Sequence, residues 1–214
     1  MENLLTYFGY ILYGVLGMVA LWGAFCVTLV WRRVGQTRFR SEDDQVEFLE
    51  ELEGFLSKGD VNGAIEHCED DRRAMPQLAL LALSNRELGY AKVRQLVADR
   101  FQRDVLSDLE HRLSWVYTTI KSAPMVGLLG TVVGMMGAFL NLSTAETVKA
   151  DQMAGDIMVA LITTALGLAI AIPLVFAAAS VSLKIRQMEE LVGAGMTQFM
   201  ETLKAMLGGG SPKK

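Results

Sequence analysis

Residues 157–183 read IMVALITTALGLAIAIPLVFAAASVSL and contain no Asp, Glu, Lys, Arg or His. A helix needs about 20 mostly apolar residues to cross a bilayer, so this stretch is long enough to span one. Two further stretches lack these side chains and are equally long, NLLTYFGYILYGVLGMVALWGAFCVTLVW at 3–31 and SAPMVGLLGTVVGMMGAFLNLSTA at 122–145. The sequence therefore predicts an all-α membrane protein with three transmembrane helices. A charge carrier inside the membrane must come from another chain.

Basic residues mark the side of the membrane on which each stretch ends. Arg32, Arg33, Arg38 and Arg40 follow the first stretch, whereas only Glu2 precedes it. The positive-inside rule then predicts an N-terminus outside the cytoplasm and, after three spans, a C-terminus inside it. The acidic leader and the long apolar run are also unlike a cleaved signal peptide.

These signals predict the following organisation, given in chain order. The predicted parts are a first transmembrane helix with its N-terminus outside (1–31), a cytoplasmic helical domain (32–121), a second transmembrane helix (122–145), a short periplasmic loop (146–156), a third transmembrane helix (157–183), and a cytoplasmic helix with a flexible tail (184–214).

The predicted cytoplasmic domain shows helical periodicity and punctuation. Apolar residues recur at helical spacing from Val46 to Leu56, Gly59 is a stop signal, and Asp60 is a cap for the next helix. Another break is expected at 73–76. From Tyr90 onward the pattern predicts one long helix that continues through the second span.

Composition argues against several classes of function. The chain has 24 acidic and 20 basic residues, which gives no sign of nucleic-acid binding. Cys26 and Cys68 have no metal-ligand spacing to another Cys or His. His67 and His111 lie apart in charged helical segments without a nucleophile constellation. We therefore expect neither an enzyme nor a bound metal or cofactor.

The second span contains closely spaced glycines around one hydroxyl. Gly130 and Gly134 form a small-xxx-small pair, and Gly127 extends the small surface. Small residues let membrane helices approach closely, so ordinary helix packing is one interpretation. Thr131 stands among these glycines, and a threonine in a membrane helix commonly donates to its own helix, here to the carbonyl of Gly127.

The third span supplies a matching set of residues. Thr163 and Thr164 are adjacent hydroxyls, and Gly167 lies one helical step beyond Thr164. Two spans with small residues around hydroxyls are suited to lining a narrow polar seam. We therefore take Thr131, Thr164 and Thr163 as candidate residues of this seam, which the family resemblance described next makes the candidate proton pathway.

The two runs together resemble a known family. APMVGLLGTVVGM at 123–135 and ALITTALGLAIAIP at 160–173 strongly resemble the ExbB/TolQ branch of the MotA/TolQ/ExbB proton-channel family. The close resemblance covers about 118–183, and the order of spans and cytoplasmic segments also fits this branch. It implies a protein of the bacterial inner membrane that is driven by the proton motive force.

The resemblance also implies an assembly. In this family five copies form a ring around a central channel, and a dimer of a one-span ExbD/TolR-type partner inserts its helices there. The partner bears the membrane aspartate that takes up the proton, and it passes work to the cell envelope through a TonB- or TolA-type protein. Thr131 and Thr164 match the pore-lining hydroxyls, while Pro124 and Pro173 match the helix-shaping prolines.

Two positions depart from the family pattern. Some members have a glutamate five residues before the threonine that matches Thr164, and this chain has Val159 there. Lys121 stands where a small or hydroxylated residue is common. The first departure argues against a proton role for a carboxylate of this chain at that position.

A different class of function fits the same glycine faces. A membrane scaffold would assemble partner helices without moving ions. A neighbouring gene for a one-span protein with a membrane aspartate would favour the channel, and its absence would favour the scaffold. A flagellar-type stator is disfavoured, because that branch has four spans and a larger cytoplasmic domain.

Overall fold

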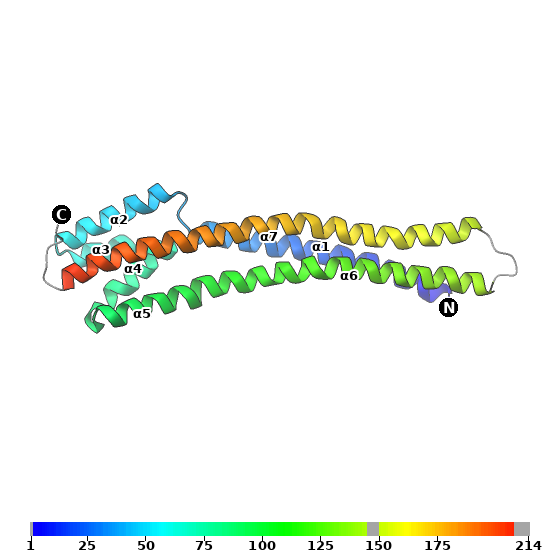
Figure 1. Ribbon diagram of the computed structural model, residues 1–214, viewed down its shortest axis with the longest axis horizontal. Coiled ribbons are helices and arrows are strands. Elements are labelled where there is room, and N and C mark those ends of the chain that lie inside the picture. The colour runs from blue at the N-terminus through cyan, green and yellow to red at the C-terminus, as the bar shows by residue number, and fades with distance from the viewer. Residues whose placement is uncertain (1, 145–149, 208–214) are drawn as a thin grey trace. The chain divides into compact units, whose positions relative to one another are not determined.

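The computed structural model describes residues 2–144 and 150–207, and within them the chain is helical with no strand (Figure 1). In chain order the elements are α1 (Glu2–Thr37), α2 (Glu42–Ser57), α3 (Val61–Glu69), α4 (Ala74–Ser84), the 3₁₀-helix η1 (Arg86–Leu88), α5 (Tyr90–Arg100), the π-helix η2 (Phe101–Leu106), α6 (Ser107–Thr144) and α7 (Ala150–Leu207). The predicted all-α fold is confirmed.

Three of these helices are long and apolar enough to cross a membrane. They are α1, α6 and α7, and they contain the three uncharged stretches. Large apolar side chains such as Leu21, Leu128 and Phe176 are exposed along them. Such contiguous apolar exposure indicates contact with lipid or with other chains. The prediction of a multi-pass membrane protein is therefore confirmed.

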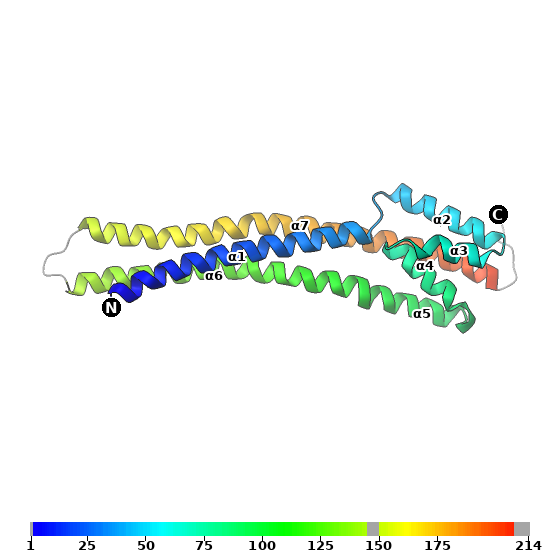
Figure 2. The ribbon, with the colours of Figure 1, turned by 180° about the vertical axis from the view of Figure 1, so that it is seen from behind.

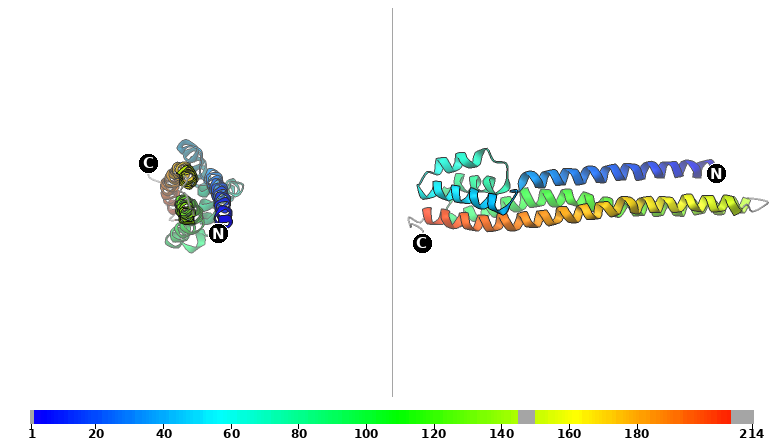
Figure 3. Two further views of the ribbon diagram at one scale, coloured as in Figure 1. Left: turned by 90° about the vertical axis from the view of Figure 1, so that its right-hand side faces the viewer. Right: turned by 90° about the horizontal axis from the view of Figure 1, so that it is seen from above.

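The chain forms two compact units. The membrane unit comprises Met1–Leu29 and Arg112–Ser180, and the extramembrane unit comprises Val30–His111 and Val181–Lys214. Within the membrane unit α6 and α7 lie side by side, and α1 packs against them (Figure 2). Figure 3 shows the same packing from two further directions.

Helix α1 packs on the other two membrane helices through a glycine. A Cβ atom at Gly23 would lie 2.7 Å from Leu174 Cδ1 and 2.9 Å from Thr119 Cγ2. Trp22 directly precedes Gly23, and Trp115 lies one turn before Thr119. The rings of these two tryptophans meet edge to face with centroids 6.5 Å apart. The small side chain thus permits a close approach that the neighbouring aromatic pair reinforces.

The second half of α7 belongs to the core of the extramembrane unit. Met188, Val192, Phe199 and Leu203 recur at helical spacing and are buried. The segment 184–207, predicted as a cytoplasmic helix, is thus the continuation of α7. This segment contacts α2 and α5, which are far away in the sequence. The helical periodicity of residues 184–207 could not predict these contacts.

Helix α2 meets this part of α7 through a buried amide. Gln45 is 5% exposed and donates from Nε2 to the carbonyl of Leu191 at 2.6 Å, whereas Val46 is 44% exposed. The expectation that Val46 belongs to the apolar face was therefore wrong. Gly195 leaves room for the amide, because a Cβ atom there would lie 2.6 Å from Gln45 Nε2.

The predicted turn between α2 and α3 is confirmed. Gly59 has a φ of +76°, a left-handed conformation that glycine adopts without a Cβ clash. Asp60 then caps α3 by accepting from the N–H of Gly63 at 2.9 Å. The second expected break is also present, because α3 ends at Glu69 and α4 begins at Ala74 with Pro76 in its first turn.

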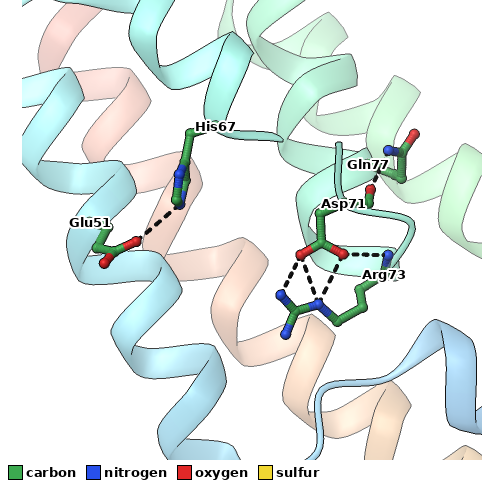
Figure 4. Close-up of polar contacts among 5 residues, drawn as sticks. All are labelled: Glu51, His67, Asp71, Arg73 and Gln77. Carbon is green, nitrogen blue, oxygen red and sulfur yellow. Dashed lines mark hydrogen bonds and ion pairs between the residues drawn. The ribbon is translucent and has the colours of Figure 1, made fainter. Parts of the chain in front are cut away.

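A charged turn closes α3 against α4 (Figure 4). The Asp71 carboxylate accepts from the backbone N–H of Arg73 at 2.9 Å and from its Nε at 2.7 and 2.9 Å, and pairs with Nη2. Gln77 donates to the Asp71 carbonyl. Burial alone would raise the pKa of Asp71, but the hydrogen bonds and charge of Arg73 outweigh it and hold this pKa below its usual range.

The neighbouring contacts of α3 pack it onto α2. The ring of His67 stacks on Phe48 with centroids 5.3 Å apart, and its Nε2 lies 3.1 Å from Glu51 Oε2 (Figure 4). Burial and the charge of Asp71 raise the pKa of the Cys68 thiol to about 12. Cys68 is therefore an unreactive core residue at neutral pH.

We expect Asp71→Asn to destabilise this turn by about 1–3 kcal/mol at pH 7, because Arg73 would lose its charged partner. The pKa of Asp71 is lower in the folded state, so its contribution is present above the unfolded pKa near about 4 and is lost as the pH falls further. Hydrogen exchange of α3 and α4 in the full-length protein would report the opening free energy across this range. Asp70→Asn, an exposed neighbour, is the matched control; equal losses in both variants would contradict the prediction.

The long helix expected from Tyr90 is interrupted. It begins at Tyr90 after Gly89, whose φ is +84°, but residues 101–106 form the π-helix η2 between α5 and α6. The expectation of one continuous α-helix was wrong at this segment. No Gly or Pro marks η2, so its wider turn had no local signal.

The boundaries around the short loop differ from those predicted. Residues 150–156 were expected in the loop, and they form the first two turns of α7. The remaining loop residues at 146–149, residue 145 at the end of the predicted second span, and the expected flexible tail at 208–214 lie outside the described residues.

Candidate functional site

Backbone contact between α6 and α7 defines the site. A Cβ atom at Gly127 would lie 2.7 Å from the carbonyl oxygen of Thr163 and 2.9 Å from Thr164 Cα. A Cβ atom at Gly167 would lie 2.6 Å from the carbonyl oxygen of Ala123. Any side chain at these positions would meet the main chain of the facing helix, which has no rotamer with which to yield. The predicted packing role of both glycines therefore agrees with their positions.

The other two predicted glycines continue this contact. A Cβ atom at Gly130 would lie 2.8 Å from Thr163 Cβ, and one at Gly134 would lie 2.5 Å from Ala160 Cβ. The four glycines thus form one seam, which we call the glycine seam: Gly127, Gly130, Gly134 and Gly167. Close approach of this kind holds helices together where lipid removes the hydrophobic drive between them.

Three hydroxyls gather on one carbonyl in this seam. The carbonyl oxygen of Gly127 lies within hydrogen-bond distance of all three, 3.0 Å from Thr164 Oγ1, 3.1 Å from Thr163 Oγ1 and 3.3 Å from Thr131 Oγ1. Thr131 Oγ1 and Thr164 Oγ1 are themselves 2.6 Å apart. Thr131 thus bonds back to its own helix, as a lone membrane threonine would, and also joins the hydroxyl of the facing helix.

The Thr131–Thr164 pair can be ordered in two directions. Each hydroxyl has one proton, so either Thr131 donates to Thr164 and Thr164 to Gly127, or Thr164 donates to Thr131 and Thr131 to Gly127. The shorter distance to the carbonyl favours the first order. In both orders the pair keeps free acceptor lone pairs, so it can receive a hydrogen bond from a protonated group.

Exposure separates the three threonines. Thr163 is 3% exposed, and its hydroxyl also donates to the carbonyl of Ala160 at 2.7 Å. Thr131 and Thr164 are partly exposed at the border of the seam. The geometry of Thr163 fits holding the helices together, whereas Thr131 and Thr164 remain accessible to a further chain.

The two prolines lie inside continuous helices, Pro124 in α6 and Pro173 in α7. Each lacks an N–H and so leaves the carbonyl four residues earlier without its helical donor. For Pro124 this is the carbonyl of Ile120, about two turns before the glycine seam. Their predicted role in shaping the helices stays a prediction.

No acid or base of this chain accompanies the hydroxyls. Neither 122–145 nor 157–183 contains Asp, Glu, Lys, Arg or His, and Val159 is a half-exposed apolar side chain. Among the described residues no three His, Cys, Asp or Glu side chains are grouped as metal ligands. The site can therefore accept and donate hydrogen bonds, but it needs another molecule to carry charge.

Gly23 and Tyr13 of α1 were missed by sequence reasoning. Gly23 admits α1 to the other two helices, as described above, and the Tyr13 hydroxyl donates to the carbonyl of Val159 at 3.4 Å. The available signal for Gly23 was its position as a glycine among bulky residues of the first span. No sequence signal predicted the contact of the Tyr13 hydroxyl.

The fold and the site define a polytopic helical membrane protein with hydroxyl groups at a glycine-packed pair of helices. The model of the MotA/TolQ/ExbB proton channel family matches residues 76–193, which is more than half of the chain and includes the whole site. The chain belongs to this family.

Relatives come from the ExbB and TolQ proteins. The chain is 36% identical over 107 residues to the Tol-Pal system protein TolQ of Haemophilus influenzae, covering 50% of this chain and 47% of TolQ. It is 37% identical over 94 residues to the biopolymer transport protein ExbB of Xanthomonas campestris, covering 42% and 37%. It is 39% identical over 101 residues to ExbB of Helicobacter pylori, covering 47% and 68%. The matched region spans less than half of the first two relatives.

Proposed function

We propose that this chain is the channel-forming subunit of a motor in the bacterial inner membrane that is driven by the proton motive force. Five copies would form a ring, and α6 and α7 of each copy would line its central channel. A dimer of a one-span ExbD/TolR-type protein would occupy the channel. The motor would power an envelope process of the TonB-dependent or Tol-Pal type. Membership of the MotA/TolQ/ExbB family and the names of the relatives support this proposal.

The observation that carries the proposal is the hydroxyl pair of Thr131 and Thr164, which joins two spans without acids or bases. An ionised carboxylate is expensive in hydrocarbon, whereas a protonated one is tolerated. A partner aspartate would therefore pass through the hydrocarbon region of the membrane in its protonated form. The hydroxyl pair would accept the hydrogen bond of that carboxyl group, since its oxygens keep free lone pairs.

The energy for the work would come from inward proton movement. Each elementary charge that crosses the membrane yields about 2.3 kcal/mol per 100 mV. The aspartate would load a proton on the outer side and release it on the inner side, and the change of charge would move the partner within the ring. The two hydrogen-bond orders of the threonine pair allow it to follow the carboxyl group without a rearrangement of the helices.

The orientation belongs to the same proposal. The N-terminus would lie in the periplasm and the C-terminus in the cytoplasm, as the arginines after Trp31 indicate. The extramembrane unit would then be cytoplasmic. The contact between Lys184 Nζ and the Trp31 ring, 3.5 Å from its centroid, supports a common end of α1 and of the third span at the membrane interface.

The direct test is co-expression with a one-span ExbD/TolR-type protein from the same organism, followed by purification and reconstitution into vesicles. We expect a stable complex with more copies of this chain than of the partner, and proton uptake driven by a membrane potential. An Asp→Asn change in the partner's span should abolish the uptake but leave the complex intact. A complex without proton uptake would contradict the channel and favour the non-conducting scaffold.

A further inference from the structure

Arginines line a cavity of the extramembrane unit. The cavity has a volume of about 660 Å³, and Arg33, Arg72, Arg73 and Arg100 contribute to its wall. Asp104 is the carboxylate among its described lining residues. Sites for small molecules range from about 300 to 1,000 Å³. The cavity therefore has the size and the sign of charge for an anionic group.

The carboxylates near the cavity leave most arginine donors available. Arg100 pairs with Asp104 at 2.6 Å and Arg73 with Asp71, but Arg33 Nε is 3.6 Å from Asp108, beyond hydrogen-bond distance. The four arginines of the cavity wall thus have three carboxylates as neighbours, those of Asp71, Asp104 and Asp108. A guanidinium group has five N–H donors and prefers bidentate pairing with phosphate.

Two features strengthen the case for a phosphate group. Arg72 is exposed and has no ion pair within the described part of the chain. Helix α4 also begins at the cavity wall, where Arg73 is its N-cap residue without a side-chain cap. The Asp71 carboxylate already accepts from the Arg73 N–H there and Pro76 has no N–H, so this helix end adds mainly the positive end of its dipole to the arginines.

The cavity begins where α1 leaves the membrane. Trp31 ends the uncharged stretch, so Arg33 lies about 3 Å and Thr37 about 9 Å further along the helix axis. The headgroup layer of one leaflet is about 5–8 Å thick, which follows from the full and hydrocarbon thicknesses of a bilayer. Both residues line the cavity, so its wall extends from the depth of the lipid headgroups, at Arg33, to just beyond them, at Thr37.

The wall also has an apolar part. Leu78, Leu80, Leu81 and Val105 line it beside the polar side chains of Gln36, Gln77 and Ser84. A free phosphate ion would gain nothing from these side chains, whereas the glycerol and the first methylene groups of a lipid would pack against them. We propose that this cavity binds the phosphate headgroup of an anionic phospholipid from the adjacent leaflet.

The test uses the full-length protein in detergent micelles, titrated with phosphatidylglycerol or with phosphatidylcholine and followed by native mass spectrometry. We expect preferential binding of phosphatidylglycerol and an affinity about tenfold lower in the Arg33→Gln/Arg72→Gln variant, from the loss of charge-assisted hydrogen bonds. Arg40→Gln removes one such charge from the same region outside the cavity and should leave the affinity unchanged, so it is the matched control for Arg72→Gln alone. Arg72→Gln alone, at an exposed residue, repeats the comparison if the double variant fails to fold.

Three outcomes would overturn the proposal. Equal loss in Arg40→Gln would show a general attraction to basic residues at the membrane surface rather than a site. Full competition by inorganic phosphate at equal concentration would show a site for free anions. Equal binding of both lipids would remove the role of charge. Circular dichroism of each variant would establish that the helices are intact.

Discussion

Gly127→Val will separate α6 from α7 and leave little folded protein. The new side chain would meet the carbonyl oxygen of Thr163 at 2.7 Å and Thr164 Cα at 2.9 Å, both at the Cβ atom alone. These are backbone atoms of the facing helix, so relief requires moving the whole helix. Overpacking of a well-packed core costs typically about 1–3 kcal/mol, and a backbone clash belongs at or above the upper end.

The separation has a second consequence for the hydroxyls. The carbonyl of Gly127 accepts from Thr131, Thr163 and Thr164, and the last two donors lie on α7. Moving the helices apart would break both interhelical bonds in an apolar environment, where no water replaces them. Clash and lost hydrogen bonds thus act in the same direction.

Thermal unfolding of the full-length protein in detergent, with size-exclusion chromatography of the assembly, would measure the effect of Gly127→Val. Gly14→Val is the matched control, because a Cβ atom at Gly14 of α1 meets nothing within 4 Å. Gly167→Val should behave like Gly127→Val, since its Cβ atom would lie 2.6 Å from the carbonyl oxygen of Ala123. An unfolding temperature of Gly127→Val equal to that of wild type would show that the glycine seam is not required.

Thr131→Val and Thr164→Val will each abolish energised function and leave assembly largely intact. Valine keeps the branched shape of threonine and removes only the hydroxyl, so the glycine seam can still close. Each variant removes one member of the 2.6 Å hydroxyl pair. Leaving the proton of the neutral carboxyl group without its acceptor costs about 1–3 kcal/mol, which corresponds to a rate about 5- to 150-fold lower.

Proton uptake by vesicles that contain the chain with its partner would measure this loss. Thr131→Ser retains the hydroxyl and should retain most of the activity. Thr28→Val is the matched control, because the Thr28 hydroxyl bonds only within α1, to the carbonyl of Ala24 at 2.8 Å, in the described part of the chain. Full activity in both Thr131→Val and Thr164→Val would refute a pore role for the pair. Loss of the assembly in these variants, with Thr28→Val intact, would instead assign the pair to helix packing.

Much of the site was predictable because its signals are local. A missing charge over more than 20 residues, glycines four residues apart and a hydroxyl among them can all be read along one helix. Turns such as Gly59–Asp60 follow from the backbone preference of one glycine and the capping oxygen of one aspartate. The candidate residues Thr131 and Thr164 came from these signals and from the family resemblance.

The remaining features depend on how separate helices are aligned. Thr163 and Thr164 are neighbours in sequence, yet one is enclosed in the seam and the other lies at its border. Gln45 is buried and Val46 exposed because the carbonyl of Leu191 lies opposite, a contact across 146 residues of sequence. The periodicity of a single helix contains no information about such a partner.

Sequence alone determined that this chain has three membrane helices, that two of them have small faces with hydroxyls, and that none supplies an acid or base inside the membrane. Tertiary structure decided that Gly127 presents one carbonyl to three hydroxyls, that the end of α7 completes the extramembrane core, and that four arginines surround one cavity. The physical reason is the distance along the sequence over which each interaction acts. Hydrophobicity, backbone preference and capping act within one helix, whereas these contacts arise only when the register and rotation of packed helices bring distant residues together.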